Sequence, residues 1–436
     1  METLNNIVLT IQNYMSNYVL IIALLGAGLW FSFRLGFIQV RGFGEGMKRT
    51  FGGLFSKKGE AGADGMSSFQ ALATAIAAQV GTGNIAGAAT ALAIGGPGAI
   101  FWMWIAAFLG MATIYAEAIM AQKYKTVGAD GQVTGGPVYY IRAAFKGTFG
   151  KVLAGIFAIL ITLALGFMGN AVQSNSIAAS FHTAFGIPQW IMGLVVAVIA
   201  IFVFMGGMKR IAKVTETIVP FMAALYIIGS LIVIIYNYKN IPYAFASIFI
   251  GAFSPSSVVG GAAGATVKLA LTKGVARGLF SNEAGMGSTP HAHAVAKVDH
   301  PVEQGFVAMT GVFIDTFIVL NLTALVILTT KSIPTGKTGA ELSQYAFSTL
   351  YGKGGDIFVA ICMFFFAFST IIGWYFFGQA NIKYLFGPKA VKIYSAAAAV
   401  CVFLGSLAEV DLVWNMADCF NSLMVVPNIL ALFALS

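Results

Sequence analysis

The chain has 436 residues, of which 58% are hydrophobic and only 9% are charged, and its mean hydropathy is +0.84. A soluble globular chain carries about 25% charged residues, so this chain has too few polar side chains to cover soluble domains. The composition excludes a soluble enzyme, a secreted disulfide scaffold and a disordered protein, and it predicts a polytopic membrane protein. The net charge of +9 arises in short connections, without the basic stripe or tail that follows a nucleic-acid backbone.

Apolar segments of about 20 residues are long enough to cross a bilayer as helices. By that rule the sequence predicts about eleven transmembrane helices, at 18–34, 66–94, 98–122, 150–181, 189–207, 214–236, 264–290, 303–329, 356–381, 392–407 and 412–434. The first is interpreted as a retained helix, because it lacks the flanking features of a signal peptide. The chain is therefore predicted to be an all-α membrane protein, with residues 1–436 forming a single transmembrane domain.

The distribution of basic residues predicts the orientation of the chain. Of the 25 Lys and Arg residues, 18 fall in the connections after odd-numbered spans, 4 lie in connections on the opposite side, and 3 lie within the seventh span. Basic residues accumulate on the cytoplasmic side of membrane proteins. The sequence therefore predicts a multi-pass protein of the cell membrane, with its N-terminus outside and its C-terminus in the cytoplasm.

The second span contains Gly81-Thr82-Gly83-Asn84 close to its midpoint. Its two glycines cost a helix roughly 2 kcal/mol in propensity, and a helix break in lipid persists only where protein or a water-filled cavity satisfies the freed backbone groups. A break here would offer the carbonyls of Ala77 and Val80 to a cation, and the amides of Gly83 and Asn84 to an anion. The alternative is that the glycines only allow close helix packing.

The seventh span contains a second glycine-rich polar stretch, Ser281 to Ser288. Each interrupted span opens a set of five spans, over residues 66–236 and 264–434. Because five is odd, the second set begins on the opposite side of the membrane, so the two sets form an inverted repeat preceded by one extra helix. This pattern is typical of secondary transporters that bind substrate near the membrane midplane.

This arrangement resembles the LeuT-type fold of the amino acid–polyamine–cation superfamily. The segments GTGNIAG at 81–87 and SNEAGMGS at 281–288 resemble signatures of the alanine or glycine:cation symporter family, and the resemblance covers essentially the whole chain. It implies a symporter that imports small neutral amino acids with Na⁺ by alternating access. It implies no enzyme activity, no organic cofactor, no nucleic acid and no obligatory protein partner.

The resemblance also implies which residues bind substrate and ion. The second half of the second span is expected to hold the substrate carboxylate, polar groups of the seventh span face the ammonium, and Met286 and Trp374 exclude bulky side chains. The expected substrate-binding residues are Gln79, Thr82, Gly83, Asn84, Gln173, Ser281, Gly285, Met286 and Trp374. The expected Na⁺ ligands are the carbonyls of Ala77, Val80 and Phe366 with the hydroxyls of Ser369 and Thr370.

Two alternatives to these assignments stay open. The hydroxyls of Ser369 and Thr370 can instead bond back to carbonyls of their own helix, as Ser and Thr in helices commonly do. The polar run around Gln173 in the fourth span can instead mark an exposed helix end.

Ionisable residues within spans are functional candidates by default. Those of this chain are Glu117, Glu216, Arg277, Glu283, Asp315 and Asp418. Arg277 is predicted to lie near the outer mouth, where a gating ion pair would form. Glu283 is expected to satisfy loose backbone amides or to pair with a cation.

Other residues bear on rival functions. Titration of Glu283 or Asp315 would suit a proton-coupled amino-acid symporter of the same fold, which is the alternative function. Asp315 and Asp418 lack the G-x-G-D context of membrane aspartyl proteases, and His291 and His293 are interpreted as a surface pair at a cytoplasmic helix end.

Overall fold

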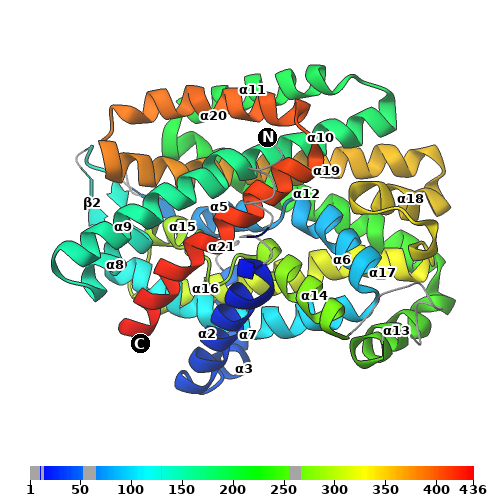
Figure 1. The fold of residues 1–436 in the computed structure, drawn as a ribbon, viewed down its shortest axis with the longest axis horizontal. Coiled ribbons are helices and arrows are strands. Elements are labelled where there is room, and N and C mark those ends of the chain that lie inside the picture. The colour runs from blue at the N-terminus through cyan, green and yellow to red at the C-terminus, as the bar shows by residue number, and fades with distance from the viewer. Residues whose placement is uncertain (1–9, 11–13, 53–64, 129, 255–266) are drawn as a thin grey trace.

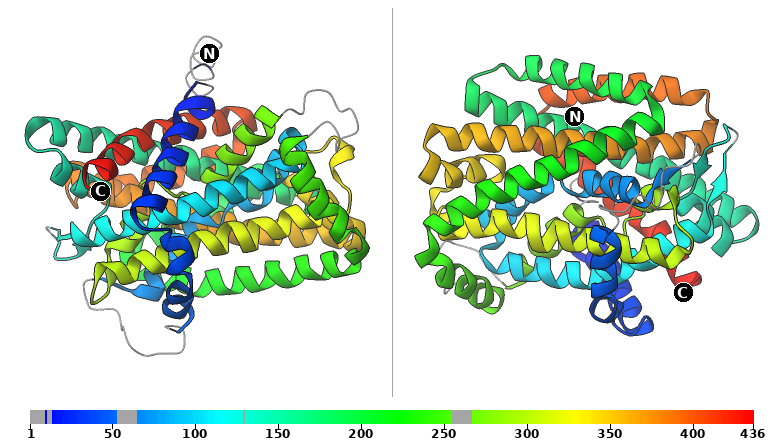
Figure 2. Two further views of the ribbon diagram at one scale, coloured as in Figure 1. Left: turned by 90° about the horizontal axis from the view of Figure 1, so that it is seen from below. Right: turned by 180° about the vertical axis from the view of Figure 1, so that it is seen from behind.

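The computed structural model describes residues 10, 14–52, 65–128, 130–254 and 267–436. The first residues of the predicted seventh span, 264–266, lie outside this range. Figure 1 shows that the long helices run largely along one direction, with α5 near the centre and α11 beside α20 along one edge. The two further views in Figure 2 show the same arrangement from below and from behind.

The elements follow one another with short connections. The N-terminal part forms η1 (Met15–Val19), α2 (Leu20–Arg34), α3 (Ile38–Arg41) and α4 (Phe43–Gly52). Next come β1 (Met66–Ser67), α5 (Ser68–Gln79), η3 (Gly83–Gly87), α6 (Ala88–Gly95), α7 (Gly98–Lys123), β2 (Thr126–Val127), β3 (Val133–Thr134) and α8 (Pro137–Ala144). The middle of the chain forms α9 (Gly147–Ile161), η4 (Thr162–Gly169), α10 (Asn170–Phe185), α11 (Gln189–Met205), α12 (Gly207–Tyr236), η5 (Tyr238–Asn240) and α13 (Ile241–Phe253).

The remaining elements begin after the segment that precedes residue 267. They are α14 (Val267–Asn282), α15 (Pro290–Ala294), β4 (Ala296–Lys297), α16 (Pro301–Val312), η7 (Phe313–Leu320) and α17 (Asn321–Thr329). The chain then forms η8 (Ile333–Thr335), α18 (Gly339–Tyr351), α19 (Lys353–Phe386), α20 (Ala390–Leu407) and α21 (Val410–Ala434).

Seven helical stretches in the described part of the chain are long and apolar enough to cross a membrane. They are Gly98–Lys123, Gly147–Phe185, Gly207–Tyr236, Pro301–Thr329, Lys353–Phe386, Ala390–Leu407 and Trp414–Ala434. They coincide with the third, fourth, sixth and eighth to eleventh predicted spans. The first and fifth predicted spans form helices of 15 and 17 residues, and the second and seventh are each interrupted.

Both predicted interruptions are present. The interruption at residues 81–84 is called the first break, and that at residues 283–289 is called the second break. The first helix half, α5, ends at Gln79, and helical geometry resumes at Gly83 with η3, a wide π-helical turn. The second, α14, ends at Asn282, and α15 begins only at Pro290. Between them Glu283, Gly285 and Gly287 have φ values of 57°, 85° and 80°. A left-handed conformation costs a non-glycine residue about 1–2 kcal/mol, so Glu283 is held there by its surroundings.

Several short elements were not predicted. The helices α8, α13 and α18 lie in connections, and β1 pairs with β4 in parallel through Met66 with Ala296 and Ser67 with Lys297. That pair ties the start of α5 to the end of α15, although some 230 residues separate them in sequence. Two-residue strands and connecting helices leave too short a hydrophobic pattern to be recognised in a sequence.

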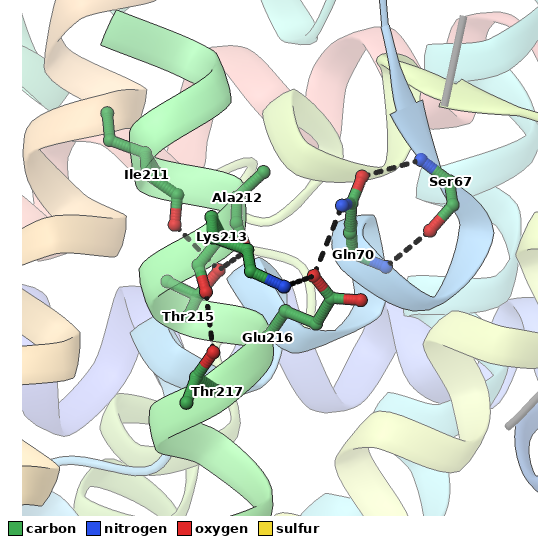
Figure 3. Close-up of polar contacts among 8 residues, drawn as sticks. All are labelled: Ser67, Gln70, Ile211, Ala212, Lys213, Thr215, Glu216 and Thr217. Atoms are coloured by element: carbon green, nitrogen blue, oxygen red, sulfur yellow. Dashed lines mark hydrogen bonds and ion pairs between the residues drawn. The ribbon is translucent and has the colours of Figure 1, made fainter. Parts of the chain in front are cut away.

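Figure 3 shows how the start of α5 is fixed against α12. The Ser67 hydroxyl accepts a hydrogen bond from the Gln70 amide at 3.1 Å, and Gln70 Oε1 accepts one from the Ser67 amide at 3.1 Å, which forms a capping box. Gln70 Nε2 also donates to Glu216 Oε2 of α12 at 3.3 Å, and Lys213 lies 3.7 Å from the same oxygen. Glu216 therefore joins α12 to α5.

Candidate functional site

The end of α5 lies against the middle of α19, where five polar groups converge. Thr370 Oγ1 lies 2.8 Å from the Ala77 carbonyl oxygen, 3.0 Å from that of Phe366 and 3.5 Å from that of Val80. Ser369 Oγ lies 2.8 Å from the Phe366 carbonyl oxygen and 3.4 Å from that of Ala77. All five residues are buried. The structure thus brings together every residue predicted to bind Na⁺, as uncharged oxygen donors.

The alternative for these hydroxyls is also present. Both Ser369 and Thr370 donate back to the Phe366 carbonyl within α19, as helix-internal bonding requires. The additional contacts with Ala77 and Val80 come from another helix, and helix-internal bonding does not account for them.

Gly81 occupies a position where a side chain does not fit. A Cβ atom there would lie 2.4 Å from Thr370 Oγ1 and 3.1 Å from Gln173 Oε1. The first break can therefore approach α10 and α19 only because residue 81 is glycine.

The variant Gly81→Ala is expected to destabilise the folded protein by about 1–3 kcal/mol, since forcing a methyl group into a packed site typically costs that much. Gly87→Ala is the matched control, because a Cβ there has its nearest atom at 3.9 Å. Thermal unfolding of the detergent-solubilised variants measures the effect. Equal stabilities for the two variants would contradict the close approach at Gly81.

The backbone of the first break is held by two amide side chains. The Gly81 amide donates to Asn84 Oδ1 at 3.0 Å, and the Thr82 amide donates to Gln173 Oε1 at 3.1 Å. Gln173 is 1% exposed, and its neighbours Asn170, Ser174 and Asn175 are buried as well. The alternative interpretation of the polar run at residues 170–175 as an exposed helix end is therefore wrong, because α10 continues past these residues as far as Phe185.

Two polar atoms beside the first break are buried without a protein partner. Within the described part of the chain, Thr82 Oγ1 and Gln79 Oε1 have no hydrogen-bond partner. Gln79 uses its other polar atom, Nε2, to donate to the Asn282 carbonyl at the end of α14 at 2.7 Å. Because buried polar atoms are almost always paired, these two oxygens are suited to a polar ligand.

Asp315 of η7 joins the two breaks. Its buried carboxylate accepts hydrogen bonds from Asn84 Nδ2 at 2.7 Å, from Ser281 Oγ at 3.0 Å and from Thr316 Oγ1 at 2.9 Å. Asn84 belongs to the first break and Ser281 to the last turn of α14. The first break also touches the last turn of α14 directly, because a Cβ on Gly83 would lie 3.2 Å from Ser281 Cα.

Glu283 has different partners from those predicted. Its carboxylate accepts hydrogen bonds from Ser288 Oγ at 2.5 Å and from Trp374 Nε1 at 2.5 Å. The loose amides of the second break are instead satisfied by Glu117 of α7, which accepts from Gly285 N at 2.8 Å and from Gly287 N at 3.0 Å. The sequence named Glu117 only as an ionisable residue in a span, because nothing in it indicates that α7 lies beside the second break.

Trp374 and Met286, the residues predicted to limit substrate size, are both 2% exposed. The Trp374 ring packs against the end of η4, since a Cβ on Gly169 would lie 2.5 Å from Trp374 Cζ3. Its hydrogen bond to Glu283 connects α19 with the second break.

The prediction of a surface pair at His291 and His293 is wrong. The two residues are 2% and 1% exposed, because α15 lies among α5, α7 and α19. The ring of His291 bonds to Asn381 Nδ2 at 2.8 Å, and that of His293 bonds to Gln304 Nε2 at 2.8 Å.

A cavity of about 580 Å³ approaches the first break from one end of the helices. It is lined by residues of η3, α6, α10, α14, α18 and α21, among them Ala86, Ser180 and Arg277. Arg277 Nη2 lies 3.2 Å from Asp418 Oδ2, and its guanidinium carbon lies 4.8 Å from the Trp414 ring centroid. Asp418 is therefore the partner of Arg277 in the ion pair that the sequence predicted without identifying its acidic member.

A smaller cavity of about 200 Å³ is lined by His291, Asp130 and Lys383. Lys383 Nζ lies 2.5 Å from Asp130 Oδ2 across it. Burial alone would raise the pKa of Asp130, but hydrogen bonds and the charge of Lys383 outweigh it and lower that pKa below its usual value. The Asp130 carboxylate is therefore ionised at neutral pH.

Known proteins resemble this chain over nearly its whole length. The chain is 43% identical to the "Sodium/alanine symporter AgcS" of Methanococcus maripaludis, over 99% of this chain and 94% of that protein. It is 42% identical to the "Amino-acid carrier protein AlsT" of Bacillus subtilis (100% and 91%) and 40% identical to the "Probable sodium/glutamine symporter GlnT" of the same organism (100% and 89%).

Among solved structures, a manganese transporter of Eremococcus coleocola matches with a TM-score of 0.53 at 14% identity, over 84% of this chain and 77% of that one. At that identity the likeness concerns the fold alone, which is that of a membrane transporter. The model of the sodium:alanine symporter family matches residues 1–436. This chain therefore belongs to the sodium:alanine symporter family, a family of multi-pass membrane transporters that carry amino acids together with Na⁺.

Proposed function

We propose that this protein imports small neutral amino acids, alanine and glycine, together with Na⁺ by alternating access. The observation that carries the proposal is the convergence of the Ala77, Val80 and Phe366 carbonyls with the Ser369 and Thr370 hydroxyls beside the first break. These oxygens would hold Na⁺. The ion would fix the shape of the break, and the break would complete the amino-acid site.

The amino acid would lie between the two breaks. Its carboxylate would be held by the Gly83 amide and by Thr82 Oγ1, which lacks a partner in the described structure. The Asn84 amide, which was expected to join them, already donates to the Gly81 carbonyl at 3.2 Å. Its ammonium would face the oxygens of Gln79, Gln173 and Ser281. Gly285, Met286 and Trp374 would bound the space for the side chain, which favours substrates as small as alanine and glycine.

The proposed architecture is a LeuT-like inverted repeat of eleven spans. Residues 66–236 and 264–434 would form the two five-helix repeats after one extra helix, each repeat opening with an interrupted helix. The separate ends of α5 and α14 at Gln79 and Asn282 support this arrangement. The N-terminus would lie outside and the C-terminus in the cytoplasm, with the larger cavity facing out.

Uptake of labelled alanine into proteoliposomes, with and without an inward Na⁺ gradient, tests the function. Saturable uptake that requires the gradient is the expected result. Uptake without saturation or counterflow would indicate a passive channel. Uptake that ignores Na⁺ but responds to a pH gradient would favour the proton-coupled alternative, to which the buried carboxylates of Glu283 and Asp315 are suited.

The Arg277–Asp418 ion pair would act as the outer gate. Replacing Arg277 with Gln is then expected to speed thiol labelling of a cysteine placed at Ser180, deep in the larger cavity, by about fivefold, because a partly exposed ion pair contributes up to about 1 kcal/mol. The experiment uses a background in which Cys362, Cys401 and Cys419 are replaced. Lys337→Gln, which breaks a pair with Glu341 at the same cavity, is the control. Equal rates in all three proteins would exclude the gate.

A further inference from the structure

Glu117 lies at the centre of a buried polar network that no role yet explains. It lies in the C-terminal half of α7 and is 0% exposed. Its two carboxylate oxygens accept from two backbone amides of the second break, Gly285 N at 2.8 Å and Gly287 N at 3.0 Å. One side chain therefore spans the left-handed turn between α14 and α15.

Asn428 of α21 supports Glu117 from the other side. Its Nδ2 atom donates to Glu117 Oε1 at 2.7 Å and to the Gly285 carbonyl at 2.8 Å. Its Oδ1 atom accepts from the Tyr140 hydroxyl of α8 at 2.5 Å. Because the Gly285 carbonyl can only accept, the amide must present its nitrogen to Gly285 and Glu117 and its oxygen to Tyr140. Asn428 and Tyr140 are each 0% exposed.

The second break has little room to move within this network. A Cβ on Gly287 would lie 2.9 Å from Asn428 Cγ, and one on Gly285 would lie 2.4 Å from Leu24 Cδ2 of α2. Helices α2, α7 and α21 thus contact a segment of three residues, and α8 supports it indirectly through the bond from Tyr140 to Asn428. The same segment begins shortly after Ser281 and Glu283, which contact Asp315 and Trp374, respectively.

We infer that Glu117 is a positioning residue of the transport site, which fixes the second break through Gly285 and Gly287 and is itself oriented by Asn428 and Tyr140. The inference rests on the proposed function, since it assigns a role within the proposed site. All three groups that face the carboxylate are donors, so a carboxylate satisfies them where a carboxamide would turn its own N–H group toward one of them. Hydrogen bonds to a charged acceptor are also roughly twice as strong as neutral ones.

The test compares Glu117→Gln with wild type in proteoliposomes. The alanine concentration for half-maximal uptake is expected to rise at least about tenfold, with a smaller change in maximal rate. Tyr140→Phe, which removes one hydroxyl from the end of the network, is expected to shift the same quantity in the same direction by less. Glu303→Gln, which removes a half-buried carboxylate paired with Arg49, is the matched control and is expected to leave it unchanged.

Hydrogen–deuterium exchange of the detergent-solubilised protein provides a readout that does not depend on transport. In Glu117→Gln the peptide spanning residues 283–289 is expected to exchange faster, while peptides of α19 keep the wild-type rate. Faster exchange throughout the helices would show a general loss of stability and would overturn the positioning role. The role would also be overturned if Glu117→Gln and Tyr140→Phe both kept the wild-type exchange rate and the wild-type alanine concentration for half-maximal uptake. If wild type lacked Na⁺-dependent uptake, the proposed function would fail, and the exchange result would still decide whether Glu117 fixes the break.

Discussion

Replacing Thr370 with alanine is expected to raise the Na⁺ concentration for half-maximal alanine uptake by at least about tenfold. Of the two hydroxyls proposed as ligands, Thr370 Oγ1 contacts all three proposed ligand carbonyls, those of Ala77, Val80 and Phe366. The interaction of a polar group with a charged one is worth about 1.5–3 kcal/mol, which corresponds to about 10- to 150-fold in affinity. Initial rates of uptake over a series of Na⁺ concentrations measure the shift.

Two further variants separate the loss of an ion ligand from the loss of packing. Thr370→Ser keeps the hydroxyl and is expected to stay within about threefold of wild type. Thr329→Ala removes a buried threonine whose hydroxyl bonds only back into its own helix among the described contacts, to Leu325 and Val326. It is expected to leave the Na⁺ dependence unchanged. A Thr370→Ala protein with wild-type Na⁺ dependence would remove this hydroxyl from the ion site.

The coupling of ion to substrate depends on the same region. Ala77 lies in the last turn of α5, and Gly81 and Thr82 follow within five residues, where their amides bond to Asn84 and Gln173. An ion held by Ala77 and Val80 would therefore stabilise the backbone that receives the amino acid. Alanine affinity that ignores Na⁺ in both wild type and Thr370→Ala would refute this coupling.

The sequence predicted features that depend on local pattern. Glycines and polar residues within apolar runs located both breaks, because a transmembrane helix tolerates them only for a reason. The placement of Ser369 and Thr370 beside Ala77 followed from the family resemblance. The contacts of Glu117, Asn428 and Tyr140 could not be predicted, since each is a single polar residue in its own helix and only the fold brings the three helices together.

The errors have a similar physical origin. His291 and His293 look like surface residues because they stand near charged residues after an apolar run, but α15 is enclosed by helices that are distant in sequence. Glu283 stands next to loose backbone amides in the chain, yet its side chain points to Trp374 and leaves those amides to Glu117. The residues adjacent in sequence do not determine where the side chains of Glu283, His291 and His293 point, because the left-handed turn at Glu283 changes the direction of the backbone.

Replacing Asp315 with asparagine is expected to reduce alanine uptake about 100-fold or more. Its carboxylate accepts hydrogen bonds from Asn84 in the first break, from Ser281 in α14 and from Thr316, its neighbour in η7. An asparagine would aim an N–H group at one of these donors and weaken the others. Losing a charge-assisted hydrogen bond and leaving a buried donor unpaired together cost about 3 kcal/mol or more, which is about 100-fold.

The same variant discriminates between the two coupling ions. Asp356→Asn is the control. Asp356 lies at the start of α19, away from both breaks, and its carboxylate accepts a hydrogen bond from Ser348 of α18. If protons drive transport through Asp315, the variant will lose its response to a pH gradient but retain exchange of alanine across the membrane, since a permanently neutral side chain mimics the protonated state. If Na⁺ drives transport and Asp315 joins the two breaks, exchange and net uptake will fall together. The retention of exchange by Asp315→Asn would therefore overturn the bridging role and favour proton coupling.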